Sequence, residues 1–286
     1  VAPAVSILGI DPASTDSGVA GVPATWSDRI TNDTATGFFG ETEAGAVVRM
    51  WADGGPISDG VIDASDVYQG LTVAVPLDGG GAFSDGQWRL AGRYDLNDPD
   101  RGFPLDGLRQ IAVTAEDLAG NVSEEAAFFN LFVDTQGPRV TAVRITDDPA
   151  TAVDESAYNL FAPKPSDGPT PLVRSLSIDI EDRPGRAAGF LYEALAPGVF
   201  PGHPATHPGH YRLEGDANGR IAIASVAFEP GPWIAGEPAT GTIVLTFARP
   251  LPDDRYTLTV SDALVDPAGN ALDGESNAVE PHDPPT

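Results

Sequence analysis

Carboxylate and carboxamide side chains recur in a five-residue motif that occurs twice, as D-L-A-G-N at residues 117–121 and as D-P-A-G-N at residues 266–270. Carboxylate and carbonyl oxygens are the ligands that Ca²⁺ prefers. The candidate calcium ligands are Asp117, Asn121, Asp266 and Asn270 in these motifs, together with Asp16, Asp28 and Asp134 elsewhere in the chain. The alternative is that each Asp only caps a turn, in which it accepts backbone N–H bonds while Gly supplies the positive φ.

Other site chemistry is poorly supported by the sequence. There is no cysteine for a thiolate ligand or nucleophile, and no G-x-S-x-G, G-x-x-x-x-G-K-[ST] or G-x-G-x-x-G motif. Three histidines lie close together at His203, His207 and His210, but the Pro and Gly between them prevent a helix that would align them. Lys164, the only lysine, stands between two prolines and reads as a loop residue. We therefore expect a chain without catalytic activity.

Charge excludes several classes of partner. The 286 residues carry 42 acids and 16 bases, which gives a net charge of −26. Such a surface repels phosphate backbones and anionic lipids, so we expect no nucleic-acid binding, and it attracts cations instead. No run approaches the roughly 20 apolar residues of a membrane-spanning helix, so no membrane insertion is expected.

The elements that position the motifs are predicted to be strands. Large apolar residues alternate with small or polar ones in residues 111–115, 176–180, 243–247 and 256–260, which is typical of strands with one buried face. Residues 47–51 and 128–133 are apolar throughout and are further strand candidates. The 32 Gly and 27 Pro between such runs favour an antiparallel sandwich over a parallel α/β fold. Only residues 186–195 suggest a helix, so the fold class is all-β.

A domain boundary is predicted at residues 134–138 (D-T-Q-G-P), where a Gly-Pro pair separates two apolar runs. Residues 1–135 hold 21 acids and 6 bases, a net charge of −15, and residues 136–286 hold 21 acids and 10 bases, a net charge of −11. Both parts are acidic, so the charge belongs to the whole surface.

Motifs in both parts resemble bacterial immunoglobulin-like (Ig-like) domains. Residues 16–135 resemble the repeats of large adhesins and biofilm proteins, through motifs at residues 16–18, 28–33, 40–45, 51–54, 106–107, 113–123 and 133–135. Residues 55–106 are longer than in the usual repeat. Residues 138–274 resemble an Ig-like domain of S-layer and other surface proteins, through residues 246–251, 256–260 and 266–273. That family has a further strand after its last motif, whereas residues 274–286 are polar and Pro-rich.

This resemblance implies two Ig-like β-sandwiches in tandem: residues 1–135, with a long insertion, and residues 136–286, whose last strand is in question. It implies a structural or adhesive module of the cell surface or extracellular space, a semi-rigid spacer whose partners are neighbouring domains of the same large protein, together with a surface glycan or protein. Such domains are commonly stiffened by Ca²⁺.

The sandwich topology also orders the candidate ligands. Asp134 is expected to face the pole of the second domain that carries Asp266 and Asn270, with Asp16 or Asp28 near the same junction. Asp117, Asn121 and Asp11 would face a preceding domain.

Two other interpretations stay open. A carbohydrate-binding or accessory module of a secreted polysaccharide-acting protein would use an exposed aromatic residue, for which Trp233 is the best candidate. Alternatively, the acidity reflects adaptation to high salt, with no specific ion site.

Overall fold

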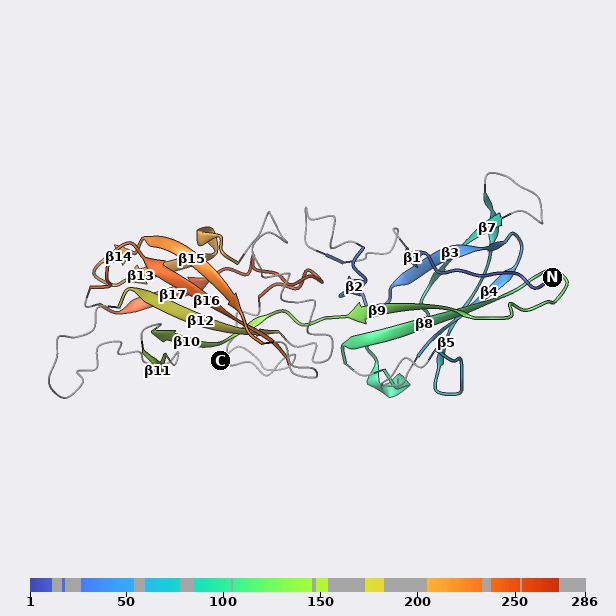
Figure 1. Ribbon diagram of the computed structural model, residues 1–286, viewed down its shortest axis with the longest axis horizontal. Coiled ribbons are helices and arrows are strands. Elements are labelled where there is room, and N and C mark those ends of the chain that lie inside the picture. Colours follow the sequence, from blue (N-terminus) through green and yellow to red (C-terminus); the bar gives the residue numbers. More distant parts are fainter. Residues whose placement is uncertain are drawn as a thin grey trace. The chain divides into compact units, whose positions relative to one another are not determined.

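The computed structural model describes the following residues: 1–11, 17–18, 27–53, 60–77, 85–103, 105–145, 148–153, 173–182, 205–232, 238–252 and 254–272. The chain divides into two compact units, Val1–Thr135 and Gln136–Thr286. Strands make up nearly all of the regular structure in the described part, as Figure 1 shows. The predicted all-β class is confirmed, whereas the assignment of each unit to an Ig-like type stays a prediction.

The first unit contains two sheets. Its four-stranded sheet has the order β1 (Gly9–Ile10), β3 (Gly37–Glu43), β7 (Asp85–Ala91) and β6 (Val75–Pro76). Its five-stranded sheet has the order β2 (Ile30–Thr31), β9 (Ala127–Val133), β8 (Gly107–Glu116), β4 (Val47–Ala52) and β5 (Val67–Val73). Neighbouring strands are antiparallel, except that β2 and β9 are parallel.

Alternation along the strands builds the core of this unit. In β4 the side chains of Val48, Met50 and Ala52 are fully buried, while the residues between them are partly exposed. They pack in one cluster with residues of the other sheet, including Phe38 of β3 and Trp88 of β7. The two sheets therefore form a sandwich around a common apolar interior.

The second unit is built in the same way. Its five-stranded sheet has the order β11 (Asp148–Val153), β10 (Arg139–Ile145), β12 (Ser175–Asp182), β16 (Ala239–Phe247) and β15 (Ile223–Pro230). Its three-stranded sheet has the order β14 (Gly219–Arg220), β13 (Tyr211–Gly215) and β17 (Tyr256–Val260). The core cluster joins both sheets, with Ile178 and Ile243 from the first and Leu213 from the second.

The predicted strands are confirmed. Residues 47–51, 111–115 and 128–133 lie in β4, β8 and β9, and residues 176–180, 243–247 and 256–260 lie in β12, β16 and β17. The predicted helix at residues 186–195 and the segment 274–286 lie outside the described residues.

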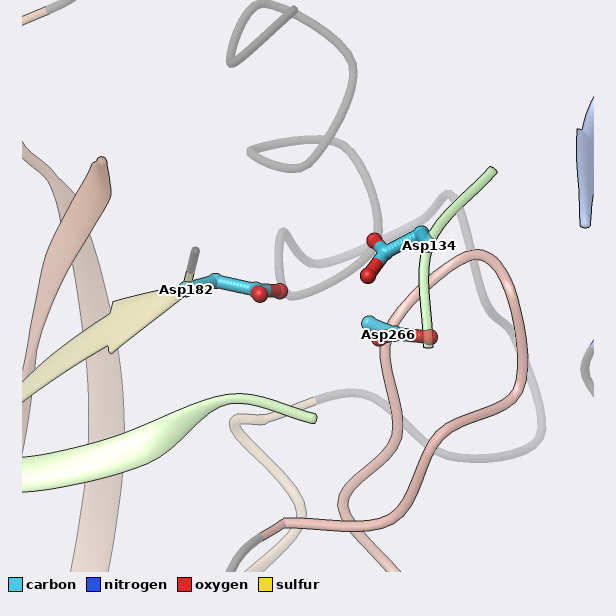
Figure 2. Close-up of side chains that lie close together, drawn as sticks. All are labelled: Asp134, Asp182 and Asp266. Atoms are coloured by element: carbon cyan, nitrogen blue, oxygen red, sulfur yellow. The ribbon is translucent and has the colours of Figure 1, made fainter. Parts of the chain in front are cut away.

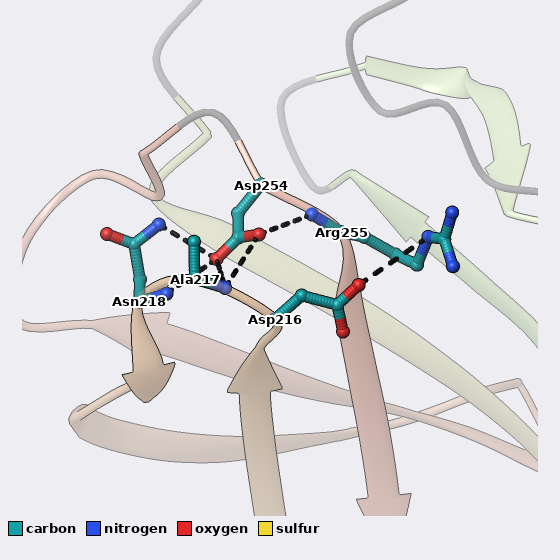
Figure 3. Close-up of polar contacts among 5 residues, drawn as sticks. All are labelled: Asp216, Ala217, Asn218, Asp254 and Arg255. Atoms are coloured by element: carbon teal, nitrogen blue, oxygen red, sulfur yellow. Dashed lines mark hydrogen bonds and ion pairs between the residues drawn. The ribbon is translucent and has the colours of Figure 1, made fainter.

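The carboxylate of Asp254 stabilises the loop that joins β13 and β14. Asp254 accepts hydrogen bonds from the backbone N–H groups of Ala217, Asn218 and Arg255 and from Asn218 Nδ2, as drawn in Figure 3. Burial acts to raise the pKa of Asp254, but these hydrogen bonds outweigh it and hold the pKa below its usual value. The ion pair of Arg255 with Asp216, at 3.8 Å, is exposed and contributes little.

Candidate metal centre

The two D-x-A-G-N motifs form turns with the same internal hydrogen bonds. In the first unit, Asp117 Oδ1 accepts from Asn121 N at 2.8 Å, and Asn121 Nδ2 donates to Asp117 Oδ2 at 2.7 Å. In the second unit, Asp266 and Asn270 repeat these bonds at 2.9 and 2.8 Å. The Gly of each motif has a positive φ, 84° and 87° respectively. The hydrogen bonds and the glycine conformation expected of a capped turn are therefore present in both units.

The two turns differ in their surroundings. Asp266 is fully buried, whereas Asp117 is partly exposed and Leu118 beside it is 71% exposed. Burial raises the pKa of Asp266 above its ordinary value, and the hydrogen bonds from Asn270 offset only part of that effect. The pKa of Asp117 is instead lowered, chiefly by its hydrogen bonds from Asn121. The buried turn thus holds a carboxylate whose ionised form needs compensation.

Two further carboxylates lie beside Asp266. One oxygen from each of Asp134, Asp182 and Asp266 lies within 4.8 Å of the others, and Figure 2 shows the three side chains. All three residues are buried, with exposed fractions of 0%, 3% and 0%. We refer to them as the carboxylate cluster.

Local structure positions each member of the cluster. Asp182 is the last residue of β12, and Asp266 begins the turn that follows β17. Asp134 directly follows β9, and its backbone N–H donates to Thr31 O at 2.9 Å. It stands two residues before Gln136, whose carbonyl accepts from Asn270 Nδ2 at 3.3 Å. The members of the cluster are therefore fixed by a strand end, a closed turn and a tethered connecting segment.

The chemistry of the cluster suits a hard divalent cation. Three buried carboxylates at this separation repel one another strongly when ionised, because the interior screens charge less than water does. Ca²⁺ takes 6–8 oxygen ligands, so three carboxylates would supply part of its shell and carbonyls or water the rest. Asn270 acts through Asp266, because its amide nitrogen donates to that carboxylate and so fixes its orientation.

The structure brings together only some of the candidate ligands. Asp134 and Asp266 lie in the cluster, and Asn270 adjoins it. Asp117 and Asn121 bond each other in the first unit and belong to no described group of three metal-ligating side chains. Asp28 also belongs to no such group among the described residues. Its carboxylate accepts a hydrogen bond from Ile30 N, and burial raises its pKa to about 6. Asp16 lies outside the described residues.

Asp182 was not among the residues that the sequence suggested. It extends the inward-facing series Leu176, Ile178 and Ile180 by one more step of two residues, and all four side chains are buried. A charged residue at an inward-facing position of a strand is unusual. A charged residue in phase with the buried apolar positions was the signal that could have identified it.

Other candidate groups have structural roles or are not described. His207 Nδ1 accepts from Gly209 N at 3.1 Å, which caps the short helix η4 (Pro208–His210). His203, Lys164 and Trp233 lie outside the described residues, so the proposed glycan contact of Trp233 stays untested. No described helix is both long and apolar enough to cross a membrane.

Comparisons with known proteins give distant matches to solved structures. No protein-family model matches the sequence, and no curated protein matches it. The chain is similar to a tetra-tandem repeat in the extending region of a large adhesion protein, with 13% identity and a TM-score of 0.26, over 92% of this chain and 50% of that one.

A structure from a 1.5-MDa bacterial ice-binding adhesin matches with 16% identity and a TM-score of 0.26, over 86% of this chain and 63% of that one. The partial N-terminal region of an enterococcal surface protein matches with 7% identity and a TM-score of 0.18, over 95% and 94%. The chain thus spans half to just under two thirds of the first two chains. Likeness at this level says nothing of what this chain binds.

Proposed function

We propose that this chain is a non-catalytic structural module of a large bacterial surface or secreted protein, a semi-rigid spacer of two Ig-like sandwiches whose connecting segment is stiffened by Ca²⁺. The observation that carries the proposal is the carboxylate cluster of Asp134, Asp182 and Asp266. It includes a residue of the connecting segment, so a cation bound there would fix that segment to the β12 end and to the turn at residues 266–270.

The connecting segment supports a spacer role, because residues on both sides of the unit boundary are held by local hydrogen bonds. Thr135, the last residue of the first unit, donates its backbone N–H and its hydroxyl to Asp106 Oδ1 at 3.0 and 2.8 Å. Gln136, the first residue of the second unit, is held by Asn270. At Gly137 a side chain would overlap the carbonyl oxygen of Ala271, so the backbone passes close against the second unit.

A cation explains why the cluster tolerates burial. Without one, burial favours the protonated form of Asp266, whose pKa it raises. With one, the ionised forms are favoured and binding of Ca²⁺ releases protons. The net charge of −26 raises the local cation concentration and so favours occupancy.

Thermal melting of the full chain tests the proposal. We expect a rise in Tm from EDTA to millimolar Ca²⁺ that equimolar Mg²⁺ does not reproduce, because Mg²⁺ demands a tighter octahedral shell. The rise should be lost in Asp182→Asn and kept in Asp117→Asn, which alters the matching exposed turn. A rise of equal size with both metals, or one that Asp182→Asn leaves intact, would overturn the calcium proposal.

A further inference from the structure

The exposed turn at residues 117–121 has a side-chain amide donor equivalent to the one that the buried turn at residues 266–270 uses to bind the connecting segment. In the second unit, Asn270 Nδ2 donates to Asp266 Oδ2 and also to Gln136 O. In the first unit, Asn121 Nδ2 donates to Asp117 Oδ2, and among the described residues it has no second acceptor. One amide hydrogen of Asn121 is therefore available to a carbonyl group from outside.

Apolar surface surrounds that donor. Leu118 is 71% exposed and Val122 is 50% exposed. In the second unit, the position of Leu118 is taken by Pro267, which is buried. Because both turns share the same internal hydrogen bonds, their different exposure reflects what lies over them and not how they are folded.

The place of the exposed turn in the first unit agrees with a docking role. Leu118 lies against the turn between β3 and β4, since a Cβ added at Gly45 would be 3.5 Å from Leu118 Cδ1. The N-terminal segment contacts β3 near the end of that strand that leads into this turn, where Thr42 Oγ1 donates to Ala4 O at 2.7 Å. In the second unit, Arg139 likewise pairs with Glu181 near the end of β12.

We propose that residues 117–122 form a docking surface for the connecting segment of a preceding module in the same polypeptide. The occupant would present a backbone carbonyl to Asn121 and a close-passing backbone against the turn, which is what Gln136 and Gly137 present to Asn270 and Ala271. This inference rests on the proposed function, since it requires a series of modules, but it does not require a metal ion at the docking surface.

A fusion chain tests the inference. Residues 1–137 are placed ahead of Pro3 of a full chain, because Pro3 and Pro138 directly precede the paired residues Ala4 and Arg139. The upstream copy carries Glu124→Asp, at an exposed position, so that peptides of the two copies differ in mass. The upstream turn, which receives no additional segment, is the internal control.

Hydrogen exchange is followed by mass spectrometry in EDTA and in Ca²⁺. We expect amides of residues 117–121 in the downstream copy to exchange at least about tenfold more slowly than those of the upstream copy. Leu118→Glu in the downstream copy should abolish the difference, while in the single chain it should leave Tm unchanged because the side chain is exposed. Equal exchange in the two copies would overturn the inference, whereas a Ca²⁺ response lost only with Asp182→Asn would leave the proposed function intact.

Discussion

Replacing Asp182 by Asn is expected to have opposite effects on stability in the absence and in the presence of Ca²⁺. Asn has nearly the shape of Asp but carries no charge. In EDTA it removes repulsion from the carboxylate cluster, so the free energy of unfolding should rise. In Ca²⁺ it removes a ligand, so the stabilisation by the ion should be lost.

The structure sets the size of the first effect. Two unit charges at the outer limit of 4.8 Å repel by about 3.5 kcal/mol at an effective dielectric constant of about 20. The gain cannot exceed about 4 kcal/mol, because the cluster can relieve the same repulsion by taking up a proton. Protonating an Asp of ordinary pKa at pH 7 costs about 4 kcal/mol. We expect a gain of about 2 kcal/mol, or roughly 4–8 °C in the Tm of a unit of this size.

The second effect follows from linkage. A ligand that binds only the folded state, at a free concentration of a hundred times Kd, stabilises by about 2.7 kcal/mol. The parent chain should therefore melt roughly 5–10 °C higher under such Ca²⁺ conditions than in EDTA. In Asp182→Asn we expect most of this increment to disappear.

Differential scanning calorimetry in EDTA and in a Ca²⁺ series measures both effects. Glu229→Gln is the matched control, because it removes the same charge from an exposed position of the same unit. If Asp182→Asn lowered Tm in EDTA and kept the full Ca²⁺ increment, the reasoning from cluster repulsion and from ligation would both be refuted.

Three further predictions concern pH and the connecting segment. Because burial raises the folded-state pKa of Asp266, the free energy of unfolding in EDTA should fall as pH rises from about 4 through the raised pKa. Ca²⁺ should remove this fall. Asp28, with its pKa of about 6, should cause a smaller fall that persists when calorimetry is done in Ca²⁺. Asp106→Ala removes two hydrogen bonds to the connecting segment and should lower the free energy of unfolding of the first unit by about 1–3 kcal/mol in urea denaturation, without changing Ca²⁺ affinity in calorimetric titration. Gly137→Ala should lower the Tm of the second unit, because a side chain there meets a backbone carbonyl, whereas Gln136→Ala should not, because the contact at that residue uses its backbone; equal melting of the two variants would contradict the close approach.

Local sequence patterns predicted most of the strands correctly. The alternation in residues 111–115 and 176–180 requires one buried face, and β8 and β12 have it. The D-x-A-G-N motifs predicted capped turns for a similar reason, because every hydrogen bond of such a turn joins residues within five positions of each other.

The candidate site was predictable only in part. Asp134 and Asp266 followed from the motif and from the sandwich topology. Asp182 was missed, because an Asp at the end of a strand is usually exposed to solvent, and only its phase with Leu176, Ile178 and Ile180 indicated that it points inward. Asp28, Asp117 and Asn121 carry the same functional groups, yet in the structure they hydrogen-bond within their own loops.

The sequence by itself determined the net charge of −26, the all-β class and the internal form of both turns. The charge follows from the residue counts, the strands from local alternation, and the turns from hydrogen bonds between residues close together along the chain. Only the tertiary structure decided which of two nearly identical turns is buried and which carboxylates share a buried cluster. Asp134, Asp182 and Asp266 are separated by 48 and 84 positions along the chain. Their proximity depends on where a strand ends, how a loop closes and where the chain enters the second unit, and these are properties of the packed sheets and not of any local motif.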